Sequence, residues 1–199
     1  MISIIVPYLS DSPCISICKK LLKDHTINQY ELIEIVDSRD VYDAFNSGVR
    51  SAKGEIVILI SDDMFVSKGW DIPYKKYARG KTVCTGYLVE PGAIQVSPKN
   101  IEKNFGKTPS TFDSASFFAW ADEVKPIIPE CVDGKGWYMP LAMEKKYWVD
   151  YPNEKKFPYP NDIDLIDNIL PNMGYSFLKV NSIVYHLQAF TARKDVARI

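Results

Sequence analysis

Long hydrophobic runs are absent from this chain of 199 residues, and so is a strong excess of charge of either sign. The longest apolar runs are far shorter than the roughly 20 residues that cross a bilayer. The net charge of −1 argues against a protein built mainly to coat nucleic acid. We find no internal repeat and no low-complexity segment. With 46% hydrophobic and 25% charged residues, the chain is expected to form one globular domain with a substantial core.

Cysteine is scarce, with four residues in the chain. Cys14 and Cys18 would lie one turn apart on a helix, but no second close pair completes a zinc site. The start of the sequence, Met1-Ile-Ser-Ile-Ile-Val, is typical of a strand rather than of a signal peptide. Reduced core thiols in a cytoplasmic protein with no membrane span are therefore the expectation.

Glycine-rich phosphate loops are missing as well, both of the G-x-G-x-x-G and of the G-x-x-x-x-G-K kind. The first half instead alternates strand and helix patterns. Apolar runs predict strands at 2–6, 31–36 and 56–60, and apolar stripes predict helices over 13–22 and 41–52. This order predicts an α/β fold with a mostly parallel central sheet flanked by helices.

Capping residues mark the ends of both predicted helices. Ser12-Pro13 predicts an N-cap with proline at the first helical position, and Ser38 or Asp40 is expected to cap the second helix. Gly54 is expected to end that second helix, as glycine often does.

The chain is organised around an apolar, mostly β-branched run at 56–60 that is followed by Ser61, Asp62 and Asp63. Unpaired charges are costly inside a sheet, so the two carboxylates are expected at its carboxyl edge, where open α/β sheets bind ligands. A divalent cation would relieve their repulsion. Oxygen ligands favour Mg²⁺ or Mn²⁺, which can also bind a substrate's phosphates. The alternative is a solvated Asp-Asp turn.

The same edge of the sheet collects residues from three predicted strands, which are followed in turn by Pro7-Tyr8, Asp37 and Asp62-Asp63. Their convergence on one crevice is typical of a nucleotide site. Because no glycine loop is present, a metal would have to hold the phosphates, which favours Asp63 as its ligand.

A set of motifs recurs in a characteristic order: Ser3-Ile-Ile-Val-Pro7, Ile35-Val-Asp37, Asn46-Ser-Gly48, Ala52-Lys-Gly54-Glu55-Ile56, Ile60-Ser-Asp-Asp63 and Gly69-Trp70. This order resembles that of the family 2 glycosyltransferases, which have the GT-A fold of nucleotide-diphospho-sugar transferases. The resemblance implies a single GT-A domain over 1–199 with a Rossmann-like sheet. Residues 1–89 would form the nucleotide-sugar-binding half and residues 90–199 the acceptor-side half.

The resemblance also implies how the nucleotide base is held. Pro7, Tyr8 and Asp37 would contact the base, and the helix that carries Asn46 would pack beside them. The loop after the second strand is shorter than in the family, because Asp37-Ser38-Arg39 stands where Asp-Asp-Gly-Ser is usual.

In that family an Asp-x-Asp motif binds the diphosphate through Mn²⁺ or Mg²⁺. Here the motif reads Ser61-Asp62-Asp63, so a serine replaces the first carboxylate. By alignment Asp63 takes the metal-ligand position and Asp62 touches the ribose. His186 follows a strand predicted at 175–185, where the family often has a histidine that reaches back to the metal, so it is the expected second ligand. The alternative is a structural histidine.

Signals in the second half are weaker. Helices are predicted over 69–77, over 117–124 and from Pro140 to Trp148, and a strand at 81–89, with a loop from Glu90 to Thr111. Aromatic residues and lysines alternate over 135–157, and the family carries aromatic residues beneath the donor sugar, so Trp137 is expected to contact the donor. The alternative is core aromatics beneath solvated lysines.

A further helix is predicted from Asn161, as its N-cap, to Met173, with Gly174 closing it. Asp162 is the expected general base that takes the acceptor hydroxyl's proton, with Asp164 in reserve. The segment resembles the family's Glu-Asp-x-Asp-Leu motif, with Asn161 in place of the Glu. The alternative is that these carboxylates only stabilise the start of the helix through its dipole.

The resemblance predicts a metal-dependent inverting glycosyltransferase of the hexosyltransferase type, with a UDP-sugar favoured as donor. The acceptor would be a glycan, a small molecule or a modified nucleic acid, and the tail at 191–199 would either close over the diphosphate or stay mobile. One alternative is an inactive nucleotide- or glycan-binding module of the same fold, motivated by Ser61 and Asn161. Another is a sugar nucleotidyltransferase, which the missing basic glycine loop disfavours.

Overall fold

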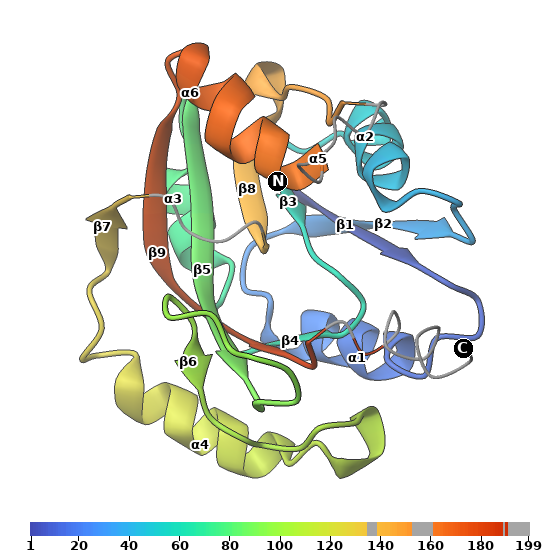
Figure 1. Ribbon diagram of the computed structural model, residues 1–199, viewed down its shortest axis with the longest axis vertical. Coiled ribbons are helices and arrows are strands. Elements are labelled where there is room, and N and C mark those ends of the chain that lie inside the picture. Colours follow the sequence, from blue (N-terminus) through green and yellow to red (C-terminus); the bar gives the residue numbers. More distant parts are fainter. Residues whose placement is uncertain (135–138, 153–160, 189, 191–199) are drawn as a thin grey trace.

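The computed structural model describes residues 1–134, 139–152, 161–188 and 190. Within these residues a nine-stranded sheet forms the centre of the molecule, and seven of its strands follow the order β2-β1-β3-β8-β5-β9-β4 (Figure 1). Strand β6 pairs with β5, and β7 pairs with β9. The strands are β1 (Ile2–Tyr8), β2 (Tyr30–Val36), β3 (Ile56–Leu59), β4 (Met64–Val66), β5 (Thr82–Glu90), β6 (Ile101–Glu102), β7 (Cys131–Asp133), β8 (Leu141–Glu144) and β9 (Ser176–His186).

The first three strands form the parallel part of the sheet. β1 lies between β2 and β3 and runs parallel to both, as the alternating strand and helix patterns predicted. β8 then pairs antiparallel with both β3 and β5, while β5 runs parallel to β9. At the far edge β4 pairs antiparallel with β9. The predicted α/β fold is confirmed, and β8, β4 and β7 take part in its antiparallel pairs.

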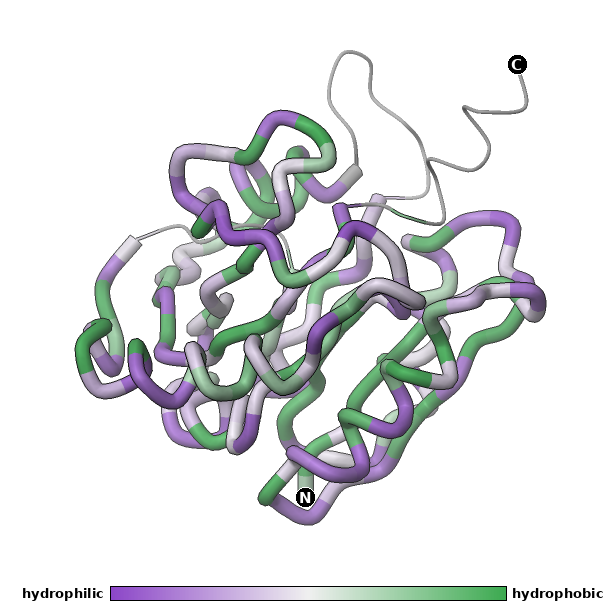
Figure 2. Tube along the Cα trace, turned by 90° about the horizontal axis from the view of Figure 1, so that it is seen from below, coloured by the Kyte–Doolittle hydropathy of each residue, from purple (hydrophilic) through white to green (hydrophobic). Residues whose placement is uncertain are grey.

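Helices cover both faces of the sheet (Figure 1). Cys18, Tyr74 and Phe117 bring α1 (Ile15–His25), α3 (Ile72–Tyr77) and α4 (Ser114–Val124) into one core cluster. The opposite cluster holds α2 (Val41–Ser51) and the helical segment 161–172, which runs through α5 (Asn161–Ile163), a π-helix (Asp164–Ile169) and α6 (Leu170–Asn172). Hydrophobic and hydrophilic residues alternate around the turns of the helices in Figure 2, as they do in amphipathic helices. No helix in the described ranges is long and apolar enough to span a membrane.

Two glycines let α2 and the chain after it pass close to β1. A Cβ atom on Gly48 would lie 2.4 Å from Cγ2 of Ile5, and one on Gly54 would lie 2.6 Å from the backbone nitrogen of Ser3. Helix α2 ends at Ser51, and Ala52 is its C-cap. Gly54 therefore serves the close contact with β1 rather than the end of the helix.

The caps of the first two helices differ from each other. Asp40 accepts hydrogen bonds from the backbone nitrogens of Tyr42 and Asp43, which confirms it as the N-cap of α2. The prediction for α1 is wrong, because its N-cap position is Cys14 and not Ser12. The Ser12 hydroxyl donates instead to a carboxylate of the predicted metal motif, described below.

The helix predicted from Pro140 to Trp148 is also wrong. Its first part forms strand β8, and only Lys145–Tyr147 is helical, as one short 3₁₀ turn. All four residues of β8 are buried, because β8 lies between β3 and β5. Pairing on both sides thus overrides the local preference of this segment.

Candidate functional site

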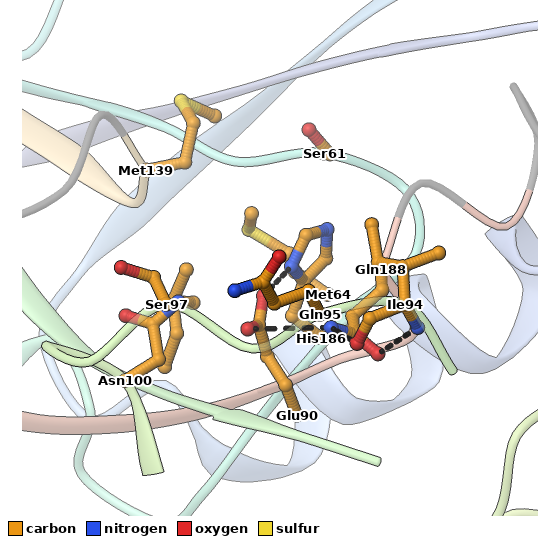
Figure 3. Close-up of a pocket in the computed structure, with 11 residues that line it drawn as sticks. Ser61, Met64, Glu90, Ile94, Gln95, Ser97, Asn100, Met139, His186 and Gln188 are labelled. Carbon is orange, nitrogen blue, oxygen red and sulfur yellow. Dashed lines mark hydrogen bonds and ion pairs between the residues drawn. The ribbon is translucent and has the colours of Figure 1, made fainter. Parts of the chain in front are cut away.

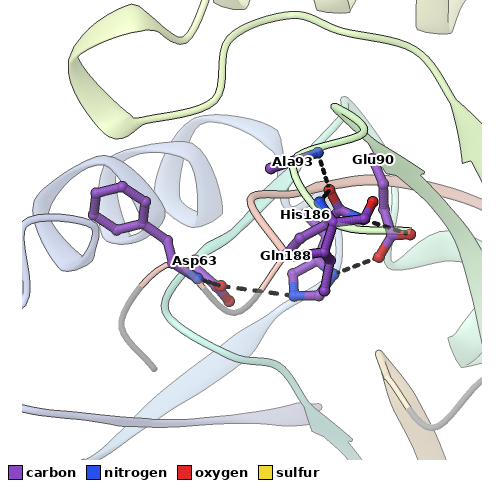
Figure 4. A network of polar contacts seen from close by, with 7 residues as sticks. Asp63, Glu90, Ala93, His186 and Gln188 are labelled. Carbon is purple, nitrogen blue, oxygen red and sulfur yellow. Dashed lines mark hydrogen bonds and ion pairs between the residues drawn. The ribbon is translucent and has the colours of Figure 1, made fainter. Parts of the chain in front are cut away.

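Asp63 and His186 lie next to each other at the end of the sheet. Asp63 comes directly before β4, and Met64 pairs with His186 in the β4–β9 register. This register brings Nε2 of His186 to 3.6 Å from Oδ2 of Asp63 (Figure 4). The structure therefore brings together the two side chains that were predicted to ligate a metal.

The chain after β9 holds Asp63 in place. The backbone nitrogen of Leu187 donates to the carbonyl oxygen of Asp63 at 3.1 Å, and the backbone nitrogen of Phe190 donates to its Oδ2 at 3.0 Å. Asp63 is only 3% exposed. A carboxylate has about four acceptor positions, and the bond from Phe190 uses one of those of Asp63. The carboxylate therefore has capacity left for a cation.

Glu90 lies on the other side of the imidazole ring. It is the last residue of β5, whose parallel neighbour is β9, and its Oε1 lies 2.9 Å from Nδ1 of His186. Burial raises the pKa of the Glu90 carboxyl, but hydrogen bonds, above all from His186, outweigh this and hold the pKa below its usual value. Glu90 was predicted to lie in a loop and was not among the predicted site residues. Its position at the end of an apolar strand, like that of Asp63, is the signal that could have found it.

Gln188 fastens the loop after β5 to the chain after β9. Its backbone has a positive φ of 56°, and its side chain is buried. Oε1 accepts from the backbone nitrogens of Ala93 and Ile94 at 2.6 and 3.2 Å, and Nε2 donates to the carbonyl oxygen of Ile94 at 3.1 Å. This clamp gives the start of the loop a fixed place beside Glu90.

A cavity of about 320 Å³ opens beside these residues. Figure 3 shows Ser61 and Met139 on one side of it and Glu90, His186 and Gln188 on the other. Its lining mixes apolar side chains with amides and hydroxyls, as small-molecule sites do. The described lining residues are Ser61, Met64, Leu88, Glu90, Ile94, Gln95, Ser97, Asn100, Met139, His186 and Gln188.

Asp62 points to a different neighbour. The Ser12 hydroxyl donates a short hydrogen bond to Oδ2 of Asp62 and accepts one from the backbone nitrogen of Cys14 at 3.2 Å. Burial raises the pKa of Asp62, the hydrogen bond from Ser12 opposes this rise, and the nearby Asp63 adds to it. Asp62 thus ties the segment before α1 to the end of β3. Its contact with a ribose stays a prediction.

The residues predicted to hold a nucleotide base lie at the carboxyl ends of β1 and β2. Tyr8 and Asp37 are neighbours there, since the backbone nitrogen of Asp37 donates to the carbonyl oxygen of Tyr8 at 3.0 Å. The hydroxyl of Tyr8 donates to Oε2 of Glu34 at 2.7 Å, and this bond raises the pKa of Tyr8. Oδ1 of Asp37 accepts from the backbone nitrogen of Ser10 at 2.7 Å. Pro7 and Tyr8, the last two residues of β1, pair in register with Ile35 and Val36 of β2.

Asn46 is buried on α2 and bonded within the protein. Its side-chain nitrogen donates to the carbonyl oxygen of Tyr151 at 3.0 Å, and its side-chain oxygen accepts from the backbone nitrogen of Tyr151 at 2.8 Å. Asn46 therefore joins α2 to the second half of the chain. Trp137, the last residue predicted to contact the donor, lies outside the described residues.

Asp162 interacts with Tyr42, near the start of α2, and with Tyr151. Burial raises the pKa of Tyr42 well above its usual value, and the charge of Asp162 and a hydrogen bond to it add to the rise. The pKa of Tyr151 is raised by burial and then by Asp162. Asp162 is not among the described residues that line the cavity beside His186.

Asp164 begins the π-helix of the segment. Its Oδ1 accepts from Nδ2 of Asn168 at 2.9 Å, and its buried Oδ2 has no hydrogen-bond partner among the described residues. π-helical turns are often found at functional sites. The roles of Asp162 and Asp164 in catalysis stay predictions.

The donor atoms of Asp63 and His186 fit a divalent cation. Ligands of Mg²⁺ lie about 2.1 Å from the ion, so atoms 3.6 Å apart can contact one ion together. Within the part of the chain that the structure describes, no three His, Cys, Asp or Glu side chains could hold a metal ion as a group. Glu90 contacts the other ring nitrogen of His186, so it stands behind that ligand and not beside it.

The fold is that of the GT-A glycosyltransferases. A crystal structure of GalNAc-T7 with UDP, GalNAc and Mn²⁺ matches 93% of this chain with a TM-score of 0.64 and 12% sequence identity. The match spans 43% of the GalNAc-T7 chain, so this chain corresponds to less than half of that protein. No protein-family model matches the sequence, and no curated protein matches it either. The predicted GT-A fold is confirmed, while membership of family 2 stays a proposal.

Proposed function

We propose that this protein is a metal-dependent glycosyltransferase that takes a sugar from a nucleotide diphosphate. The observation that carries the proposal is the pair of Asp63 and His186, held 3.6 Å apart beside a cavity in a GT-A fold. Carboxylate sites of this kind commonly bind a cation that also takes phosphate oxygens of the substrate as ligands. The Mn²⁺ and UDP in the GalNAc-T7 structure make Mn²⁺ and a UDP-sugar the first candidates.

Each group in the proposed reaction has a part. Asp63 and His186 would hold the cation, which would supply positive charge to stabilise the diphosphate leaving group. Tyr8 and Asp37, at the neighbouring strand ends, hold the base of the nucleotide. Asp62 stabilises the loop that carries Asp63 through its bond to Ser12.

Asp162 is the proposed general base of an inverting transfer. It takes a proton from the acceptor hydroxyl as that oxygen attacks the anomeric carbon of the donor sugar. Its contact with Tyr42 orients the carboxylate and links it to the start of α2. Asp164 is the second candidate, because its buried Oδ2 has no partner among the described residues.

The acceptor class is left open among a glycan, a small molecule and a modified nucleic acid. The sequence lacks the Gln-Arg-Trp motif of the processive synthases of family 2. A family 2 enzyme without this motif would transfer single sugars. We propose such single transfers, and the mixed amides and hydroxyls around the cavity are compatible with a sugar hydroxyl.

Release of nucleoside diphosphate tests the proposal. The protein is incubated with a panel of nucleotide-sugars and Mn²⁺, and the product is quantified with and without a chelator. We expect UDP release that requires the metal and is lost in Asp63→Asn. Nucleotide binding with no release from any donor would favour the inactive binding module, for which Ser61 and Asn161 are the sequence evidence. Pyrophosphate release from a nucleoside triphosphate and a sugar phosphate would favour a nucleotidyltransferase.

A further inference from the structure

We propose that Glu90 is a positioning residue that holds His186 with its proton on Nδ1 and so turns Nε2 toward the cation beside Asp63. The inference rests on the proposed function, because it assigns a role at the same metal site. Glu90 itself would not touch the cation, since it lies on the far side of the imidazole ring from Asp63 (Figure 4).

The proton assignment follows from the contact of the ring with Glu90. An ionised carboxylate can only accept, so the 2.9 Å contact to Oε1 of Glu90 requires a proton on Nδ1 of His186. In a neutral imidazole the other nitrogen then carries a lone pair. That nitrogen, Nε2, is the atom that lies 3.6 Å from Asp63. A carboxylate behind a histidine in this way fixes the ring and raises its basicity as a metal ligand.

Glu90 is itself held on several sides. It is 6% exposed, it ends β5, and its carbonyl oxygen accepts from the backbone nitrogen of Lys103 at 2.9 Å. The side-chain nitrogen of Gln188 lies 3.5 Å from Oε2 of Glu90. Because strand β5 and the side chain of Gln188 both restrain Glu90, its carboxylate has a fixed direction. It can therefore hold the imidazole ring of His186 in one orientation.

The competing interpretation is a purely structural histidine. A doubly protonated His186 could bridge Asp63 and Glu90 as an ion-paired link between β4 and β5. The two interpretations differ in whether Nε2 carries a hydrogen atom. They also differ in whether Glu90 affects metal affinity. If His186 is only a structural link, Glu90 would have no effect on metal affinity.

Nitrogen NMR distinguishes these interpretations. The signals are simple to assign because the chain contains only two histidines, His25 and His186. A long-range ¹H–¹⁵N spectrum is recorded on metal-free protein in mildly alkaline solution, and His25→Gln assigns the signals. We expect His186 to show the Nδ1–H form, and Glu90→Gln to lose this preference, since an amide can donate as well as accept. A wild-type ring protonated on Nε2 would overturn the proposal.

Metal affinity gives the second measurement, by titration of Mn²⁺ in the presence of UDP. We expect Glu90→Gln to weaken Mn²⁺ binding about 10- to 100-fold, and Glu90→Asp to restore part of the loss. Glu144→Gln is the matched control, because Glu144 is 8% exposed at another place in the sheet and bonds to the backbone nitrogen of Gly80. Equal affinity in wild type and Glu90→Gln would overturn the proposal. Absence of Mn²⁺ binding in wild type would instead count against the proposed function, whatever the tautomer.

Discussion

Asn46 and Tyr151 exchange two hydrogen bonds across 105 positions of the sequence, and both residues are buried. The rings of Tyr42 and Phe45 on α2 also pack against Tyr151. This contact fixes α2, which follows the proposed base-binding strand ends, against the backbone and ring of Tyr151.

Replacing this asparagine tests how much the contact stabilises the protein. Asn46→Ala leaves the backbone nitrogen and oxygen of Tyr151 buried without partners, and each such loss costs about 1–3 kcal/mol. We expect the free energy of unfolding to fall by about 2–4 kcal/mol in urea denaturation. Asn46→Asp keeps an oxygen that can accept from the backbone nitrogen of Tyr151 but loses the donor. Its loss of stability should therefore differ from that of Asn46→Ala. A change below about 0.5 kcal/mol for Asn46→Ala would contradict this role.

Gly54 should tolerate no side chain. Gly54→Ala would push a methyl group to within 2.7 Å of backbone atoms of β1, which is itself buried between β2 and β3. We expect a loss of about 3 kcal/mol by thermal or chemical unfolding, at the upper end of overpacking effects. Gly80→Ala is the control, because no atom of the described residues lies within 4 Å of the added Cβ. Its positive φ of 59° then opposes alanine by about 1 kcal/mol. Equal losses at both positions would show that the close approach of the chain to β1 is unimportant.

The charge of Asp62 should cost stability in the metal-free protein. Its pKa in the folded state is raised above the usual value, so the folded state holds the proton more tightly than the unfolded state does. Stability therefore increases as the pH falls through the folded pKa, and it is lower at neutral pH. We expect Asp62→Asn, which keeps an acceptor for Ser12, to be more stable than wild type at neutral pH. The difference should shrink toward acidic pH in denaturation curves measured with a chelator present. A variant that is less stable at neutral pH would contradict this account.

Asp162 should matter for transfer and not for nucleotide binding. Removing a general base typically slows the chemical step by about 10²- to 10⁴-fold. We expect Asp162→Asn to lower kcat by this factor while the affinity for UDP with Mn²⁺ stays unchanged. Tyr42→Phe is the comparison, because it removes the hydroxyl beside Asp162 and leaves the carboxylate. An unchanged kcat in Asp162→Asn, with loss in Asp164→Asn, would move the base role to Asp164.

The parallel part of the fold could be predicted from local patterns. Mostly apolar runs marked β1 and β3, and the apolar stripe of α2 placed Phe45 and Val49 in the core. A charged side chain is costly inside a buried strand, so Asp63 was expected beyond the strand's end. It lies there, directly before β4.

The antiparallel strands could not be predicted in this way. β8 has four residues and β4 three, so neither contains enough sequence for a period to be seen. Their conformation depends on neighbours far away in the chain, with Leu141 paired to Leu59 and Met64 to His186. Glu90 was missed for the same reason, since only the pairing of β5 with β9 brings it to His186.

The central claim is that Asp63 and His186 hold one divalent cation together with a nucleotide diphosphate, and a titration of Mn²⁺ followed by electron paramagnetic resonance tests it most directly. The signal of free Mn²⁺ is measured against protein concentration, with and without UDP, in wild type, Asp63→Asn and His186→Ala. We predict one bound Mn²⁺ per chain in wild type, tightened by UDP, and loss of this binding in either variant while the near-UV circular dichroism is retained. Binding of Mn²⁺ and UDP that is equally tight in the wild type and in both variants would contradict the account.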